Sequence, residues 1–131
     1  MIYLLDTNVC IQYLTKRNLQ VVARVGAETG RMALCSVVKA ELLLGAYKSA
    51  KVAQNLAMFR SFFAAFPSLD FDDASAEIYG RIRAQLERAG TPIGSNDFLI
   101  AAIALANDLT IVTHNTREFG RVAGLRLDDW E

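Results

Sequence analysis

The stretch Tyr3-Leu4-Leu5-Asp6-Thr7-Asn8 opens the chain with a short apolar run that ends at an acidic residue. Ile2–Leu5 has the length and composition of a buried strand, and the spacing of apolar residues in Asn8–Leu14 predicts a helix. A strand that passes through a short turn into a helix is the first half of a βαβ unit. This stretch therefore favours an α/β fold in which Asp6 directly follows the first strand.

The rest of the chain repeats the same alternation of strands and helices. Four further strands are predicted at Met32–Cys35, Leu69–Phe71, Thr110–Thr113 and, as an edge strand, Leu125–Leu127. Helices are predicted at Leu19–Glu28, Val37–Tyr47 with Ser36 as its N-cap, Ala50–Phe66, Asp72 or Asp73 to Ala89, Asn96–Asn107 and around Arg117–Gly120. We expect an α/β fold with a central, mostly parallel sheet of four to five strands and helices on both faces, residues 1–131 forming one domain.

The composition limits the classes of protein to which the chain can belong. Hydrophobic residues make up 53% of it, which is enough to build a core and argues against disorder. Fourteen basic residues balance fourteen acidic ones, which argues against a protein that holds nucleic acid by bulk charge, so any RNA contact is expected to be local and helped by metal ions. No apolar run is long enough for a membrane span, and the start lacks a basic signal-peptide region. We expect a cytoplasmic protein in which Cys10 and Cys35 are buried, reduced thiols.

Acidic residues fall at the places where an α/β fold forms its site. Asp6 follows the first strand, Glu41 lies in the helix after the second, Asp97 in the first turn of a helix, and Glu118 after the fourth strand. Ligands bind beyond the carboxyl ends of parallel strands, near the switch in strand order. Each acid alone is also typical of a helix cap or a solvated helix surface. The combination predicts that all four gather at one edge of the sheet.

Carboxylates that meet in one pocket raise one another's pKa unless cations bind between them. Mg²⁺ is the hard divalent ion that best fits carboxylate and phosphate oxygens, whereas zinc sites usually need His or Cys ligands that are scarce here. A metal ion that polarises a phosphate and activates water favours hydrolysis of phosphodiester bonds. The acids therefore indicate a metal-dependent phosphodiesterase.

Several motifs, taken in this order and at this length, carry a family resemblance. They are Tyr3–Asn8, Ser36–Gly45 with Glu41, Gly94–Ala102 with Asp97, Ile111–Phe119 with Glu118, and the ending Val122–Trp130. Over essentially its whole length the chain resembles VapC toxins of the PIN-domain superfamily. The resemblance implies an endoribonuclease that requires Mg²⁺ or Mn²⁺ and leaves a 5′-phosphate and a 3′-hydroxyl.

The resemblance also implies roles for individual residues. Asp6, Glu41 and Asp97 match the three core acids of the family, as catalytic residues and metal ligands. Many PIN domains carry a fourth acid just after the fourth strand, where this chain has Asn115, and Glu118 one helical turn later is expected to replace it. The groups expected to orient ligands or water are Thr7, Asn8, Thr113 and Asn115.

VapC toxins act within larger assemblies. The resemblance implies a small VapB-type antitoxin that neutralises the chain, a homodimer of the toxin, and a toxin–antitoxin hetero-oligomer that contacts operator DNA only through the antitoxin. It implies structured RNA as substrate, with tRNA as one candidate, and no membrane partner.

Two other functions remain open from the residues alone. A phosphatase could use Asp6 as a nucleophile, but Asn8 stands where a second acid is usual. A catalytically inactive interaction module would keep the fold, but it would be expected to have lost core acids. His114 near the fourth strand is interpreted as structural because no partner for it is evident, and Trp130 as a packing residue.

Overall fold

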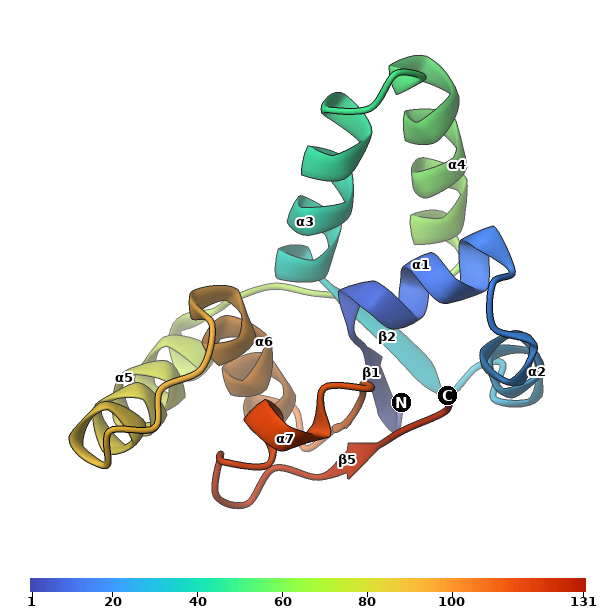
Figure 1. Cartoon of the computed structure of the whole chain (residues 1–131). Coiled ribbons are helices and arrows are strands. Elements are labelled where there is room, and N and C mark those ends of the chain that lie inside the picture. The colour runs from blue at the N-terminus through green and yellow to red at the C-terminus, as the bar shows by residue number, and fades with distance from the viewer.

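In the computed structural model, which describes residues 1–131, a parallel five-stranded sheet is flanked by helices (Figure 1). The strands are β1 (Tyr3–Leu5), β2 (Met32–Cys35), β3 (Ser68–Leu69), β4 (Thr110–Val112) and β5 (Leu127–Asp128). The helices are α1 (Thr7–Thr15), α2 (Leu19–Ala27), α3 (Ser36–Tyr47), α4 (Val52–Ala64), α5 (Asp73–Arg88), α6 (Ser95–Ala106) and α7 (Thr116–Phe119). The predicted α/β class is confirmed, and the sheet is parallel throughout.

The strand order β3-β2-β1-β4-β5 reverses direction at β1. β1 pairs with β2 on one side and with β4 on the other. The chain adds β2 and β3 on one side of β1 and then β4 and β5 on the other, so the switch point lies between β1 and β4. Right-handed crossovers then place helices before and after the reversal on opposite faces. Figure 1 shows this arrangement, with α1 and α2 on one side of the sheet and α5 and α6 on the other, while α3 and α4 form a pair that extends away from it.

Polar side chains fix the starts of three helices. Asp6 caps α1, Asn18 caps α2 and Asp72 caps α5, each by accepting a hydrogen bond from a backbone N–H group of the first turn. The expectation that Ser36 caps the third helix was wrong, because α3 begins at Ser36 itself and Cys35 occupies the cap position without a side-chain bond. Strand and helix follow one another there without a loop residue, which leaves no place for a separate cap.

The two edge strands differ from their predicted bounds. β3 pairs only with β2, through Leu34 with Ser68 and Cys35 with Leu69, so its pairing ends where β2 ends. Phe71, expected in this strand, lies beyond it and packs edge-on against Tyr79 with ring centroids 5.9 Å apart. β5 is likewise shifted, to Leu127–Asp128. The remaining elements agree with their predicted bounds to within about two residues.

The core surrounds the sheet and includes buried residues of α1, α2, α3 and α5, and α6 contributes the largest share of any helix. Six residues of α6 are buried, and the small side chains Ala101, Ala102 and Ala104 let this helix approach the strands closely. Cys10 and Cys35 are buried and free, as expected, and burial raises the pKa of both thiols, so they stay protonated. None of the helices combines the length and the apolar character that crossing a membrane requires.

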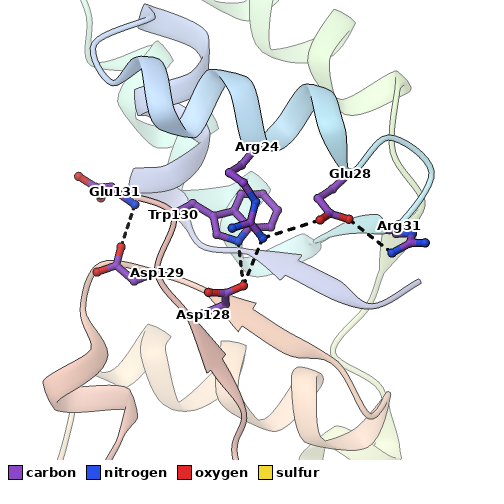
Figure 2. A network of polar contacts seen from close by, with 7 residues as sticks. All are labelled: Arg24, Glu28, Arg31, Asp128, Asp129, Trp130 and Glu131. Carbon is purple, nitrogen blue, oxygen red and sulfur yellow. Dashed lines mark hydrogen bonds and ion pairs between the residues drawn. The ribbon is translucent and has the colours of Figure 1, made fainter.

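The C-terminal segment is tied to α2 by a network of polar and aromatic contacts (Figure 2). The Arg24 guanidinium lies 4.8 Å from the centre of the Trp130 ring and 3.5 Å from an Asp128 carboxylate oxygen. Trp130 is 3% exposed, and its Nε1 donates to Asp128 at 3.0 Å. Trp130 is thus a packing residue, as expected, and it links the segment after β5 to α2 through Arg24.

Candidate active site

Four segments bring the four predicted acids to the carboxyl edge of the sheet. Asp6 follows β1, Glu41 lies in the second turn of α3, Asp97 in the first turn of α6, and Glu118 in α7, which follows β4. The charges of Asp6, Glu41 and Glu118 all act on the carboxyl of Asp97. The acids therefore form one electrostatic unit at the switch point between β1 and β4, where an α/β sheet places its ligands.

Asp6 is the most enclosed of these groups, with 7% of its surface exposed. Its Oδ1 accepts a hydrogen bond from the backbone N–H of Thr7, and its Oδ2 accepts one from the Thr113 hydroxyl, both at 2.8 Å. Burial raises the pKa of Asp6, these two bonds lower it in part, and the charge of Glu41 raises it further. Both oxygens are therefore fixed in position by donors from β1–α1 and from the end of β4.

Thr7 joins two of the acids. Its backbone N–H donates to Asp6, and its hydroxyl donates to Glu41 Oε1 at 2.7 Å. Asp6 and Thr7 are consecutive, whereas Glu41 comes from a different helix. This single residue therefore fixes the orientation of α3's carboxylate relative to that of Asp6.

Asp97 is half-buried at the start of α6, and its pKa is raised to about 6. Burial is the largest cause, followed by the charges of Asp6, Glu41 and Glu118. The helix N-terminus favours the ionised form by about 0.3–1 kcal/mol, which is too little to offset these effects. The loop before α6 also comes close, since a Cβ added at Gly94 would lie 3.3 Å from Asp97 Oδ2. The ionised form of Asp97 is thus disfavoured because Asp97 is half-buried and the other three acids lie near it.

The fourth corner of the site contains Asn115 and Glu118. The Asn115 side-chain Nδ2 donates to Glu118 Oε2 at 2.8 Å, and the Asn115 backbone N–H donates to the Thr113 hydroxyl at 3.0 Å. Because the same hydroxyl donates to Asp6, a continuous chain of hydrogen bonds runs from Asp6 to Glu118. Three of the four residues expected to orient ligands, Thr7, Thr113 and Asn115, thus donate hydrogen bonds to the acids.

Two other residues considered from the sequence lie outside this arrangement. Asn8 is exposed and makes no side-chain hydrogen bond to any of the acids. His114 is exposed, and its Nδ1 lies 3.0 Å from Asp129 Oδ2. The ligand atoms of His114, Asp129 and Glu131 lie within 4.8 Å of one another, but this group, in which His114 and Asp129 are exposed, contains none of the four acids.

The donor set fits a hard divalent cation. No Lys or Arg side chain forms an ion pair with Asp6, Glu41, Asp97 or Glu118. The charges of these carboxylates act on one another without a basic group to offset them, and Mg²⁺ prefers a few carboxylate oxygens together with water and phosphate ligands. Neither cysteine makes a soft ligand set here, because both thiols are buried and protonated.

Sequence reasoning missed two polar residues beside the acids. Ser36 and Asn96 line a hollow next to Glu41, between α3 and α6. Their signal was present, because Ser36 starts the helix that carries Glu41 and Asn96 directly precedes Asp97. The expectation that Ser36 serves as a helix cap obscured its position at the site.

Known proteins resemble the chain along its whole length. Residues 3–125 match the family model of the PIN domain. The chain is 44% identical over 128 residues to the tRNA(fMet)-specific endonuclease VapC of Shigella flexneri. This alignment covers 98% of this chain and 97% of that protein. Among solved structures, DNA-bound VapBC from Salmonella typhimurium aligns with a TM-score of 0.95 at 39% identity over 100% of this chain and 99% of that one. VapBC2 from Rickettsia felis, bound to a promoter DNA fragment, aligns with a TM-score of 0.93 at 36% identity over 100% of both chains.

Proposed function

Since this chain belongs to the PIN domain family and, within it, to the VapC ribonucleases, we propose that it is a metal-dependent endoribonuclease that hydrolyses phosphodiester bonds in structured RNA. The observation that carries this proposal is the convergence of Asp6, Glu41, Asp97 and Glu118 without a basic partner. Gathering four acids is electrostatically unfavourable. A module that only binds a partner has no need of such a cluster, whereas a metal site for phosphate chemistry uses it to hold the ion.

The four acids are the groups that would hold Mg²⁺, or Mn²⁺ in its place. The bound ion would supply Lewis-acid stabilisation of phosphate charge and lower the pKa of water. Thr113 and the Thr7 amide hold Asp6 in one orientation, and the Thr7 hydroxyl does the same for Glu41. Such outer contacts keep ligands in the geometry that catalysis needs. With these groups fixed, a water oxygen would attack the RNA phosphorus in line with its bond to O3′. That bond breaks as the new one forms, and a proton from water ends on O3′, so the products carry a 5′-phosphate and a 3′-hydroxyl.

The ionisation of Asp97 in the metal-free protein affects how readily the proposed site takes up a metal ion. Its pKa of about 6 leaves the carboxyl mostly ionised at neutral pH, so it can serve as a ligand there. Below pH 6 the proton competes with the metal ion for this oxygen. We therefore expect activity to fall as the pH is lowered through 6.

The relatives suggest the partners and the substrate. The Shigella relative is named as specific for tRNA(fMet), and the Salmonella and Rickettsia structures contain VapBC complexes with DNA. We propose a VapB-type antitoxin as the inhibitor of this chain, tRNA as a candidate substrate, and contact with operator DNA through the antitoxin. We further propose a toxin homodimer within that hetero-oligomer, located in the cytoplasm.

The test is cleavage of total RNA by purified, antitoxin-free protein. We expect discrete cuts with Mg²⁺ or Mn²⁺ and none with excess EDTA. Asp6→Asn should abolish cleavage, because it removes a charge and an acceptor at the most buried acid. Glu77→Gln, at an exposed acid of α5 outside the site, is the matched control and should cut like the wild type. Intact RNA with folded wild-type protein and either ion would refute the proposal and favour an inactive interaction module, whereas release of phosphate from p-nitrophenyl phosphate would favour a phosphatase.

A further inference from the structure

A hollow of about 390 Å³ opens beside the acids, between α3 and α6. Glu41 forms part of its wall, and Asn96 on the facing wall directly precedes Asp97. A molecule in the hollow therefore lies next to the four acids, where the scissile phosphate of the proposed substrate would bind. Its volume is near the lower end of the range of about 300–1,000 Å³ that small-molecule sites cover.

The walls combine an apolar surface with two polar side chains that have no partner in the chain. Val37, Ala40 and Leu44 of α3 face Leu99 of α6 across the hollow. The Ser36 hydroxyl and the Asn96 carboxamide also line it, and neither side chain makes a hydrogen bond within the protein. An apolar cleft with a few uncommitted polar groups is typical of a site for a small, partly polar molecule.

We propose that this hollow binds one nucleobase of the RNA, from a nucleotide beside the scissile phosphate. Unpaired bases in RNA are bound by contacts on the ring face and by hydrogen bonds to the base edge. The Asn96 carboxamide offers a donor and an acceptor side by side, and Ser36 adds a hydroxyl that can donate or accept. Leu44 and Leu99 supply apolar surface for the ring. The inference rests on the proposed ribonuclease function, because a base reaches this hollow only with its phosphate at the acids.

The charge of Glu41 selects among possible occupants. A carboxylate or a second phosphate in the hollow would be repelled by Glu41 and by the neighbouring acids. A basic side chain of a protein partner would be attracted by Glu41, but it carries donors only, so it could pair with the Asn96 carbonyl oxygen and would leave the N–H groups of this exposed side chain to water. A neutral base satisfies both constraints, since it brings no charge and offers edge groups that both donate and accept.

The consequence is a base preference at one position next to the cut. A well-placed pair of hydrogen bonds to a base edge is worth about 1–3 kcal/mol, and 1.4 kcal/mol corresponds to a factor of ten. We therefore expect Asn96→Ala to reduce the preference for the favoured base about tenfold. Its kcat/KM for the favoured base should fall, while its kcat/KM for the other three bases should change little.

The experiment uses the full-length protein and an RNA library with random bases around the cleaved bond, with Mg²⁺, and sequences the products. Asn96→Ala removes the carboxamide, and Ser95→Ala is its matched control one residue earlier on the exposed helix start. Leu44→Ala removes part of the apolar wall, and Leu19→Ala is its matched control. Leu44 and Leu19 are 60% and 75% exposed, so neither change should disturb folding.

We expect both hollow variants to flatten the base preference and both controls to retain it. A preference that survives unchanged in Asn96→Ala and Leu44→Ala overturns the inference, even if those variants bind the antitoxin more weakly. Cleavage without any base preference in the wild type overturns it as well. In both cases the proposed nuclease function is unaffected. A wild type that cuts no RNA with Mg²⁺ or Mn²⁺ would instead refute the proposed function and, with it, this inference.

Discussion

Replacing Asp97 with asparagine should stabilise the metal-free protein at neutral pH while it abolishes metal-dependent activity. The pKa of Asp97 in the folded protein, about 6, lies about two units above the ordinary value of 3.8, because burial and three neighbouring acids disfavour its charge. One unit corresponds to about 1.4 kcal/mol, so the full shift corresponds to roughly 3 kcal/mol. Asp97 is only half-buried, and screening by solvent reduces the expected gain to about 1–2 kcal/mol.

The sign of this effect depends on pH. Below about pH 3.8 both the folded and the unfolded chain hold the proton, so Asp97 does not affect stability there. Between 3.8 and 6 the unfolded chain releases the proton first, and the folded state loses stability as the pH rises. Above 6 the cost is fully present, and Asp97→Asn removes it.

Urea unfolding in EDTA at pH 7.5 and at pH 4 measures this difference. We expect Asp97→Asn to be about 1–2 kcal/mol more stable than the wild type at pH 7.5 and nearly equal to it at pH 4. Added Mg²⁺ should stabilise the wild type more than the variant, because a ligand that binds only the folded state raises its stability. A variant that is less stable than the wild type at pH 7.5 would refute the reasoning, since Asp97 would then contribute stabilising contacts.

Two further predictions concern the residues around the end of β4. Thr113→Val should lower the free energy of unfolding by about 1.5–3 kcal/mol and reduce RNA cleavage, because Asp6 loses a buried donor at 2.8 Å; Thr113→Ser, measured in parallel by urea unfolding, should restore both. His114 is the single histidine, and its pKa is raised by the hydrogen bond to Asp129 and by that residue's charge, so NMR titration should give a pKa above 6.5 that returns toward 6.5 in Asp129→Asn. The stabilisation from the ion pair is thus fully present below pH 6.5 while Asp129 is ionised and is lost as the pH rises through the raised pKa of His114, and His114→Ala should cleave RNA at the wild-type rate.

The sequence predicts the central strands well because strands that are buried on both faces appear in it as short, continuous apolar runs. Every residue of β2 is buried, and continuous apolar runs of this length are typical of strands covered on both faces. The edge strands were predicted less accurately, because an edge strand ends where its only neighbour stops pairing. Leu69 pairs with Cys35, the last residue of β2, and nothing in the local sequence around Leu69 records that limit.

The positions of the acids could be predicted, but their contacts could not. Asp6 follows a strand, and the other three acids lie in the first or second turn of a helix, so the rule for carboxyl edges of parallel sheets places all of them without knowledge of packing. The bond from Thr113 to Asp6 spans 107 residues, and the bond from Thr7 to Glu41 spans 34. Such contacts depend on how α1, α3 and β4 pack against one another, and local sequence patterns carry no measure of that packing.

The charge balance of the chain explains why a metal ion matters twice in the proposed function. The net charge is zero, yet four carboxylates share one edge of the sheet without a basic partner. Several basic side chains are engaged elsewhere, including Arg24 with Trp130 and Asp128, and Arg126 with Asp108. Without divalent cations this edge therefore repels an RNA phosphate, and the same ions that support hydrolysis also make the approach of the substrate favourable. Removing them should weaken RNA binding as well as stop the chemistry, whereas a site that bound RNA through its own basic residues would lose the chemistry alone.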